Sequence, residues 1–154
     1  MSGPANTRFS VAVHVLTLLA DRPGRAVGSD LAASSVGSNP VHIRRVMANL
    51  RRAGIVTSRA GAGGGWALHR PPTEITMADV WDAVHGDEPV MSLHPEPNPA
   101  CRVGEQIGAA LDDLSARATV AVRSTLAETT LAQVHAIVTD ARASAADRAP
   151  QVRT

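Results

Sequence analysis

Residues 38–68 decide the fold of this chain, and they read SNPVHIRRVMANLRRAGIVTSRAGAGGGWAL. A polar pair followed by Pro40 predicts a helix start, because proline at the first helical position lacks only an N–H group that has no partner there. An apolar face follows at helical spacing, formed by Ile43, Val46, Met47 and Leu50. Gly54 is placed to end the helix in the left-handed conformation that glycine adopts easily. We therefore expect a helix from Pro40 to Ala53 that buries one face.

A β-hairpin is expected directly after this helix. Residues 55–59 form a β-branched run that is typical of a strand, and residues 66–70 form a second run. The segment between them, residues 60–65, contains four glycines. Two short runs separated by such a segment predict a hairpin with a glycine-rich tip.

Two helices are expected before this stretch. The first begins after Asn6 or Thr7, either of which can cap it, and ends before the turn at residues 21–24. The second is short, covers residues 30–35 and has Ser29 as its cap. Its inward-facing residues are predicted to be Leu31 and Ala32.

Three further regions are expected after the hairpin. Thr76 is placed to cap a helix that ends near residue 85. A proline-rich loop then covers residues 86–102, and residues 103–139 form a long helix followed by a short one. The last residues, 140–154, are expected to be a flexible tail.

The order of these elements predicts the fold class. Two helices joined by a short turn and followed by a two-stranded ribbon form a winged helix-turn-helix domain, here residues 1–85. We therefore predict a mostly α protein with a small β-hairpin wing (α+β), in which a long helix follows the winged domain.

The charge is distributed unevenly along the chain, although the net charge is only +1. Residues 1–81 contain nine arginines and four acidic residues, so their net charge is +5. Residues 82–154 contain six arginines and ten acidic residues, so their net charge is −4. This asymmetry indicates that only the first part faces a polyanion.

The winged domain offers a set of residues for contact with double-stranded DNA. A helix that reads bases exposes polar and cationic groups opposite its buried stripe and points its first turn into the major groove. Arg45 and His42 lie near that end and suit base contacts. Arg59, at the base of the hairpin, suits a narrow minor groove, and arginines farther along the helix suit phosphates. The full predicted set is Ser29, Ser38, Asn39, Val41, His42, Arg44, Arg45, Asn49, Arg52, Arg59, Gly63 and Gly64.

Other interpretations of the winged domain stay open. Arginine pairs on a helix often form only a solvated surface, and the clustering of nine arginines is what favours DNA. A winged domain can also be an adaptor that binds another protein and has weak or no specific DNA binding. An enzyme is not expected, because the glycines of residues 61–65 lack the Lys-Ser/Thr of a phosphate-binding loop and no nucleophile motif occurs.

Three segments follow the pattern of one known family. Residues 6–16 (NTRFSVAVHVL), residues 38–56 and residues 61–80 resemble the first helix, the recognition helix and the wing region of the Rrf2 family. The resemblance covers roughly the first 138 residues, and these motifs are specific in combination. It implies a homodimer that binds a palindromic operator and usually represses, with a long helix near residues 104–127 as the main dimer contact.

An apolar stripe on this long helix agrees with a dimer. It consists of Ile107, Leu111, Leu114, Ala118, Val122 and Leu126. One small domain cannot easily cover a stripe of this length. The alternative is that the helix folds back on its own winged domain.

Cys101, just before the long helix, is the one cysteine. Some members of the Rrf2 family hold an iron–sulfur cluster through three cysteines in this loop, but one thiol does not suffice, so no cofactor is expected. The position before a helix and beside Arg102 favours the thiolate, and a redox-sensing thiol is one hypothesis. A small hydrophobic residue that seats the loop is the other. His85 and His94 are nearby, but their spacing has no metal signature, so no metal site is expected.

The signal that such a regulator answers to stays open between a small molecule and a redox change. No apolar run approaches the roughly 18 residues of a membrane span, and the N-terminus lacks the basic start of a signal peptide. We therefore expect a cytoplasmic protein without membrane contact.

Overall fold

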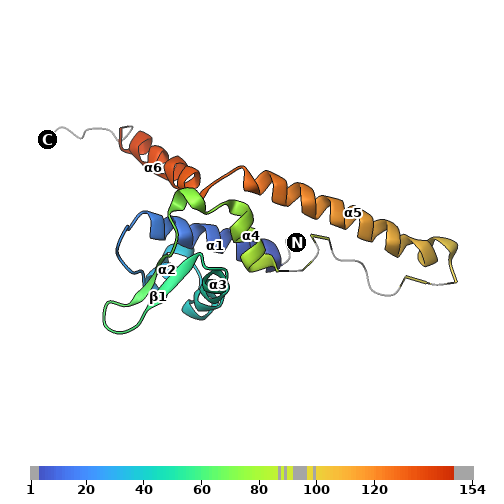
Figure 1. The fold of residues 1–154 in the computed structure, drawn as a ribbon, viewed down its shortest axis with the longest axis horizontal. Coiled ribbons are helices and arrows are strands. Elements are labelled where there is room, and N and C mark those ends of the chain that lie inside the picture. The colour runs from blue at the N-terminus through green and yellow to red at the C-terminus, as the bar shows by residue number, and fades with distance from the viewer. Residues whose placement is uncertain (1–3, 87, 89, 92–96, 99, 148–154) are drawn as a thin grey trace.

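The computed structural model describes residues 4–86, 88, 90–91, 97–98 and 100–147 of the chain. Parts of the predicted proline-rich loop and of the predicted tail lie outside these residues. Figure 1 shows the winged domain with two helices that project from it. The elements are α1 (Pro4–Ala20), α2 (Ser29–Val36), α3 (Pro40–Arg52), β1 (Val56–Arg59), β2 (Gly65–Leu68), the 3-10 turn η1 (Pro72–Glu74), α4 (Met77–His85), α5 (Arg102–Ala127) and α6 (Leu131–Asp147). The predicted fold class is confirmed.

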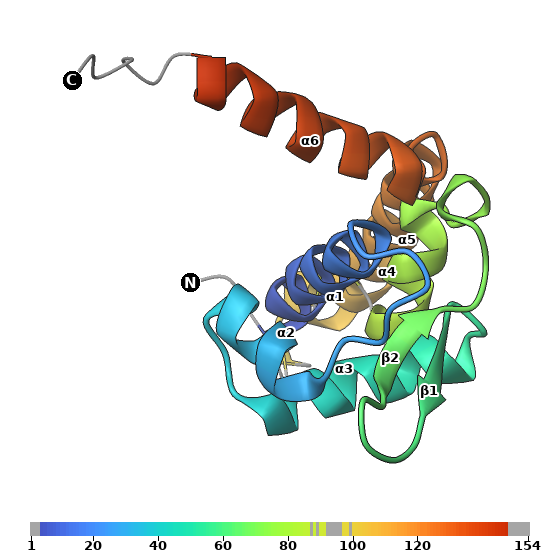
Figure 2. The ribbon, with the colours of Figure 1, turned by 90° about the vertical axis from the view of Figure 1, so that its left-hand side faces the viewer.

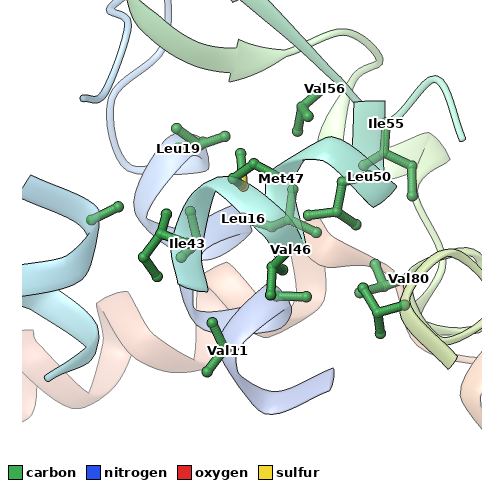
Figure 3. Close-up of a cluster of buried hydrophobic side chains, with 14 of the residues drawn as sticks. Val11, Leu16, Leu19, Ile43, Val46, Met47, Leu50, Ile55, Val56 and Val80 are labelled. Carbon is green, nitrogen blue, oxygen red and sulfur yellow. The ribbon is translucent and has the colours of Figure 1, made fainter. Parts of the chain in front are cut away.

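The core lies where α1, α3 and α4 meet. The predicted stripe of α3, formed by Ile43, Val46, Met47 and Leu50, is fully buried (Figure 3). It faces Val11 and Leu16 of α1 and Val80 of α4. Burying each large aliphatic side chain contributes about 1.5–3 kcal/mol, so this contact holds α3 in one orientation.

The hairpin is tied to the loop between α1 and α2. β1 and β2 are antiparallel, and Arg59 pairs with Gly65. Val27 and Trp66 exchange two backbone hydrogen bonds of 2.9 Å. Gly65 has φ 146°, and a Cβ added there would lie 2.5 Å from the carbonyl oxygen of Val27. Only glycine allows this close approach.

The start of α4 anchors the projecting helices. Thr76 caps α4 as predicted, in a capping box with Asp79. The backbone N–H of Met77 donates to Thr129 at 2.8 Å, and that of Leu131, a fully buried residue, donates to Ile75 at 2.8 Å. The junction between α5 and α6 is therefore part of the winged domain.

The two projecting helices leave the domain in different directions (Figures 1 and 2). α5 packs on α4, where the guanidinium of Arg123 forms a two-pronged ion pair with Asp82. The first half of α5 extends beyond the winged domain. None of the helices in the described part of the chain is both long and apolar enough to cross a bilayer.

Three local predictions differ from the structure. α1 already begins at Pro4, so neither Asn6 nor Thr7 caps it. Leu31 does not face inward but is 44% exposed, because α2 packs through its two small residues, Ala32 and Ala33. The last helix is not short: α6 continues to Asp147, well into the segment expected to be a tail.

Candidate nucleic-acid interface

The first turn of α3 is fixed by a side-chain cap. The backbone N–H of His42 donates to Oδ1 of Asn39 at 2.8 Å, and Pro40 is the first helical residue. Asn39, and not Ser38, is therefore the capping residue. The backbone N–H of Ser38 instead donates to the carbonyl of Ala33 at 2.9 Å, which closes α2. The turn between α2 and α3 is thus held by hydrogen bonds at both ends.

The outer face of α3 is cationic and bears no acidic residue. The helix carries four arginines, and its sequence PVHIRRVMANLRR has no Asp or Glu. Arg44 and Arg45 are exposed and make no ion pair with the described residues, while Val41 between them and the cap is 60% exposed. This face is therefore an uncompensated positive surface.

The other two arginines of α3 are steered by neutral partners. Nη2 of Arg52 donates to Oδ1 of Asn49 at 2.5 Å. Nη1 of Arg51 donates to Oγ of Ser58 on β1 at 3.4 Å. Neither partner is acidic, so these contacts do not offset the positive charge of α3, and both side chains are oriented by the protein before any ligand binds.

The tip of the wing lies on the same side of the molecule as α3. Figure 2 shows both at its lower edge, away from α5 and α6. Arg59 is exposed at the end of β1, and Gly61 and Gly63 have positive φ values of 89° and 73°. A turn with such angles is compact because glycine adopts them without strain. The tip is therefore narrow and cationic.

Ser29 has a structural partner. Ser29 was expected to cap α2, but α2 is capped by Gly28, and the hydroxyl of Ser29 accepts a hydrogen bond of 3.2 Å from Nε1 of Trp66. This contact joins α2 to β2. The predicted capping role of Ser29 was therefore wrong, and its hydroxyl orients the wing instead.

Two cations were missed by the sequence analysis. Arg22 and Arg25, on the loop between α1 and α2, line a cleft of about 230 Å³ together with Arg59. The sequence feature that could have indicated them is the pair of arginines that flanks the Pro23-Gly24 turn. They add positive charge beside Arg59, which lies at the end of β1 next to the tip and not, as expected, at the base of the hairpin.

Cys101 is the N-cap residue of α5, and Figure 1 shows the beginning of α5 well away from α3 and the wing. Its side chain is exposed. The backbone N–H groups of Gly104 and then Val103 lower the pKa of Cys101 below that of an ordinary thiol, because they favour the thiolate. The start of α5 therefore favours the thiolate as expected, while Arg102 is not among the causes, and a role for Cys101 in redox sensing stays a prediction.

The stripe of α5 divides between two environments. Leu126 packs against the core of its own chain, so the helix end does fold back on the winged domain. Leu114 is 46% exposed, and Ile107, Leu111, Ala118 and Val122 are half-buried. We therefore leave Leu126 out of any proposed interface between two copies.

Comparison with known proteins gives the family. Residues 5–137 match the model of the Rrf2 family, described as an iron-dependent transcriptional regulator. YwnA of Bacillus subtilis strain 168, named as an HTH-type transcriptional regulator, is 37% identical over 129 residues, which cover 84% of this chain and 95% of YwnA.

Solved structures agree with this match. A structure titled as a DNA-binding protein has a TM-score of 0.64 at 35% identity and covers 82% of this chain and 97% of its own. CymR, the global cysteine regulator of B. subtilis, has a TM-score of 0.61 at 23% identity and covers 85% of this chain and 95% of its own. At that identity the likeness to CymR shows the fold alone.

The iron in the family's description does not fit the donors of this chain. Cys101 is its one cysteine, and the described residues contain no group of three His, Cys, Asp or Glu side chains that could hold a metal ion. An iron–sulfur cluster needs several thiolates or a combination of thiolates and imidazoles. The relatives are transcriptional regulators and not enzymes. The chain belongs to the Rrf2 family of transcriptional regulators.

Proposed function

We propose that the protein is a homodimeric repressor that binds a palindromic operator in the cytoplasm through α3 and the wing. The observation that carries the proposal is the outer face of α3, which exposes arginines without any acidic residue beside them. A surface of this kind attracts the phosphate backbone, and its side chains can read base edges in the major groove.

We assign different roles to the predicted residues according to their contacts in the structure. Arg45 follows the capped first turn and has no partner among the described residues, so it is our candidate for a base contact, together with His42. Arg52 is already oriented by Asn49, which suits a phosphate contact that positions the protein without reading sequence. Arg59 and the tip glycines Gly63 and Gly64 suit the minor groove.

A palindromic operator follows from two-fold symmetry. Two copies that meet through the first half of α5 would each present one α3, and such half-sites are spaced by about one helical turn of DNA. Support comes from Ile107, Leu111 and Leu114, which lie along the part of α5 that extends beyond its own domain.

Selection of bound fragments from a random DNA pool tests this function. The expected result is an enriched inverted repeat, whose complex gives a gel shift that weakens steeply as salt is raised. If no fragment is enriched and no shift appears even at low salt, the proposal fails. The winged domain would then be an adaptor for another protein.

A further inference from the structure

A cavity of about 590 Å³ lies between α1 and α6, and nothing in the proposed DNA contact uses it. α1 turns Val11 and Leu16 toward the core and the residues of this groove to its opposite side. Figure 2 shows α6 passing on one side of α1 while α3 lies on the other. α1 is therefore part of both the groove and the core that positions α3.

The walls of the groove are apolar, and two sets of interacting polar side chains line it. Phe9, Val13, Leu18, Val134 and Val138 form the walls. The first set is the His14–Ser35 pair, in which Nε2 of His14 lies 3.0 Å from Oγ of Ser35. The second set has three members, and in it the Asp21 carboxylate lies 3.4 Å from Nε2 of His135 and 3.6 Å from Nη1 of Arg142. Pockets of roughly 300–1,000 Å³ with apolar walls and few polar groups are typical small-molecule sites.

We propose that this groove binds a small uncharged aromatic molecule that carries one hydroxyl or carbonyl group. The apolar walls suit an aromatic body, because they gain from losing contact with water. A hydroxyl and an imidazole can each donate and accept a hydrogen bond. The His14–Ser35 pair can therefore bond either a hydroxyl or a carbonyl of the ligand.

The second set, Asp21 with His135 and Arg142, is the reason why we expect an uncharged ligand. The carboxylate of Asp21 already faces two basic side chains, one of them the permanently charged Arg142. An anionic ligand would have to displace Asp21 from these partners, and a cationic ligand would have to displace the partners themselves. Either exchange costs existing ion-pair contacts, whereas a neutral polar group leaves them in place.

The groove can influence α3 through α1. A ligand that changes the packing of α6 on α1 acts on the helix whose other face contacts the stripe of α3. By reciprocity, operator DNA and the ligand must then change each other's affinity by the same factor. This coupling rests on the proposed DNA binding, but occupancy of the groove does not.

Calorimetric titration of the full-length protein with 2-naphthol, without DNA, tests the site. Val138→Trp fills the groove from α6, and Ser10→Trp fills it from α1; both positions are at least partly exposed, so the fold should tolerate them. We expect each to weaken 2-naphthol binding by about tenfold or more. Val120→Trp, at a 64% exposed position on α5 outside the groove, is the matched control and should leave the affinity unchanged.

Two chemical comparisons test the ligand class. 2-Naphthoate, the charged analogue, should bind more weakly than 2-naphthol. Naphthalene should also bind more weakly, and Ser35→Ala should reduce this difference between naphthol and naphthalene.

Several results would overturn the inference. Absence of 2-naphthol binding, or binding that both groove-filling variants leave unchanged, would exclude a ligand site here. If 2-naphthol fails to bind and Val138→Trp converts a dimer to monomers, the groove is instead covered by a second copy. If the wild-type protein binds 2-naphthol but no operator DNA, the proposed function is wrong and the proposed ligand site is still supported.

Discussion

Arg45 and Arg52 occupy the same outer face of α3, but only Arg52 is held by a hydrogen bond to a neighbouring side chain. Arg52 donates to Asn49 at 2.5 Å and is held near the helix end, whereas Arg45 has no hydrogen bond to the described residues. A side chain near the first turn reaches base edges, while one near the end reaches the backbone. The two arginines should therefore respond differently to substitution.

Arg45→Ala should weaken operator binding by about 1–3 kcal/mol and relax the preference at one base position. Arg52→Ala should weaken binding to all sequences alike and lower the slope of log affinity against log salt by about 1. Binding assays on a panel of single-base operator variants at several salt concentrations measure both effects. Equal loss of affinity across that panel for Arg45→Ala would show that Arg45 contacts only phosphate.

Cys101 should react with alkylating agents at lower pH than an ordinary thiol. The N–H groups of Gly104 and Val103 lower its pKa, so the thiolate persists as the pH falls through the range in which a free thiol is protonated. The rate of iodoacetamide labelling, followed from pH 6 to pH 10, should reach half its maximum at lower pH in the folded protein than in urea. Coincident profiles would remove the case for a sensing thiol and favour the structural interpretation of Cys101.

At the scale of elements, α3 depends on its cap as well as on its stripe. The cap satisfies a backbone N–H at the end of the helix that we place in the major groove. Without it the first turn frays, and the residues that follow Pro40 lose their fixed positions. Asn39 therefore contributes both to the stability of α3 and to the fixed positions of the residues that we expect to contact DNA.

Asn39→Ala should lower the free energy of unfolding by about 1 kcal/mol, as loss of a side-chain cap usually does. Asn49→Ala, on the same helix, is the control: its amide contacts only the exposed Arg52, so the expected loss is smaller. Urea unfolding of both variants gives the comparison. A larger loss for Asn49→Ala would mean that the contact with Arg52 matters more to α3 than the cap does.

At the scale of the whole molecule, exposed apolar side chains gather on the two projecting helices. Among the residues that the structure describes, five of the eight exposed large hydrophobic side chains lie there, namely Val103, Leu114, Val120, Ile137 and Val138. Val103 and Leu114 lie on the face of α5 that carries the apolar stripe, whereas Val120 lies on the opposite face. The dimer that we propose would cover Val103 and Leu114, and exposed apolar residues that share one face mark an interaction surface more often than scattered single residues do.

Leu114→Asp should convert the proposed dimer to monomers, because it places a charge in the middle of the apolar stripe. The chain itself should stay folded, since Leu114 is 46% exposed. Ala116→Asp adds the same charge on the opposite face of α5, where the exposed alanine lies, and should leave the dimer intact. Sedimentation equilibrium distinguishes these results, and a dimer that survives Leu114→Asp would place the interface elsewhere.

Local patterns predicted much of the winged domain. The stripe and end of α3, the hairpin and the Thr76 cap are confirmed because each depends on residues within a few positions of one another. The prediction for Leu31 was wrong because periodicity does not say which side of a short helix its neighbours occupy. The extent of α6 was missed because its last turns have few apolar residues to mark them.

The capped, arginine-rich helix and the glycine-tipped hairpin that follows it could be predicted from local patterns, since hydrogen bonding and apolar periodicity act over short distances along the chain. Long-range packing, in contrast, places Ser29 against Trp66 and Leu126 against the core of its own chain, and it forms the groove between α1 and α6. The residues of that groove are as far apart as Phe9 and Arg142. Contacts of such separation depend on how packed helices are oriented, and no local pattern specifies that orientation.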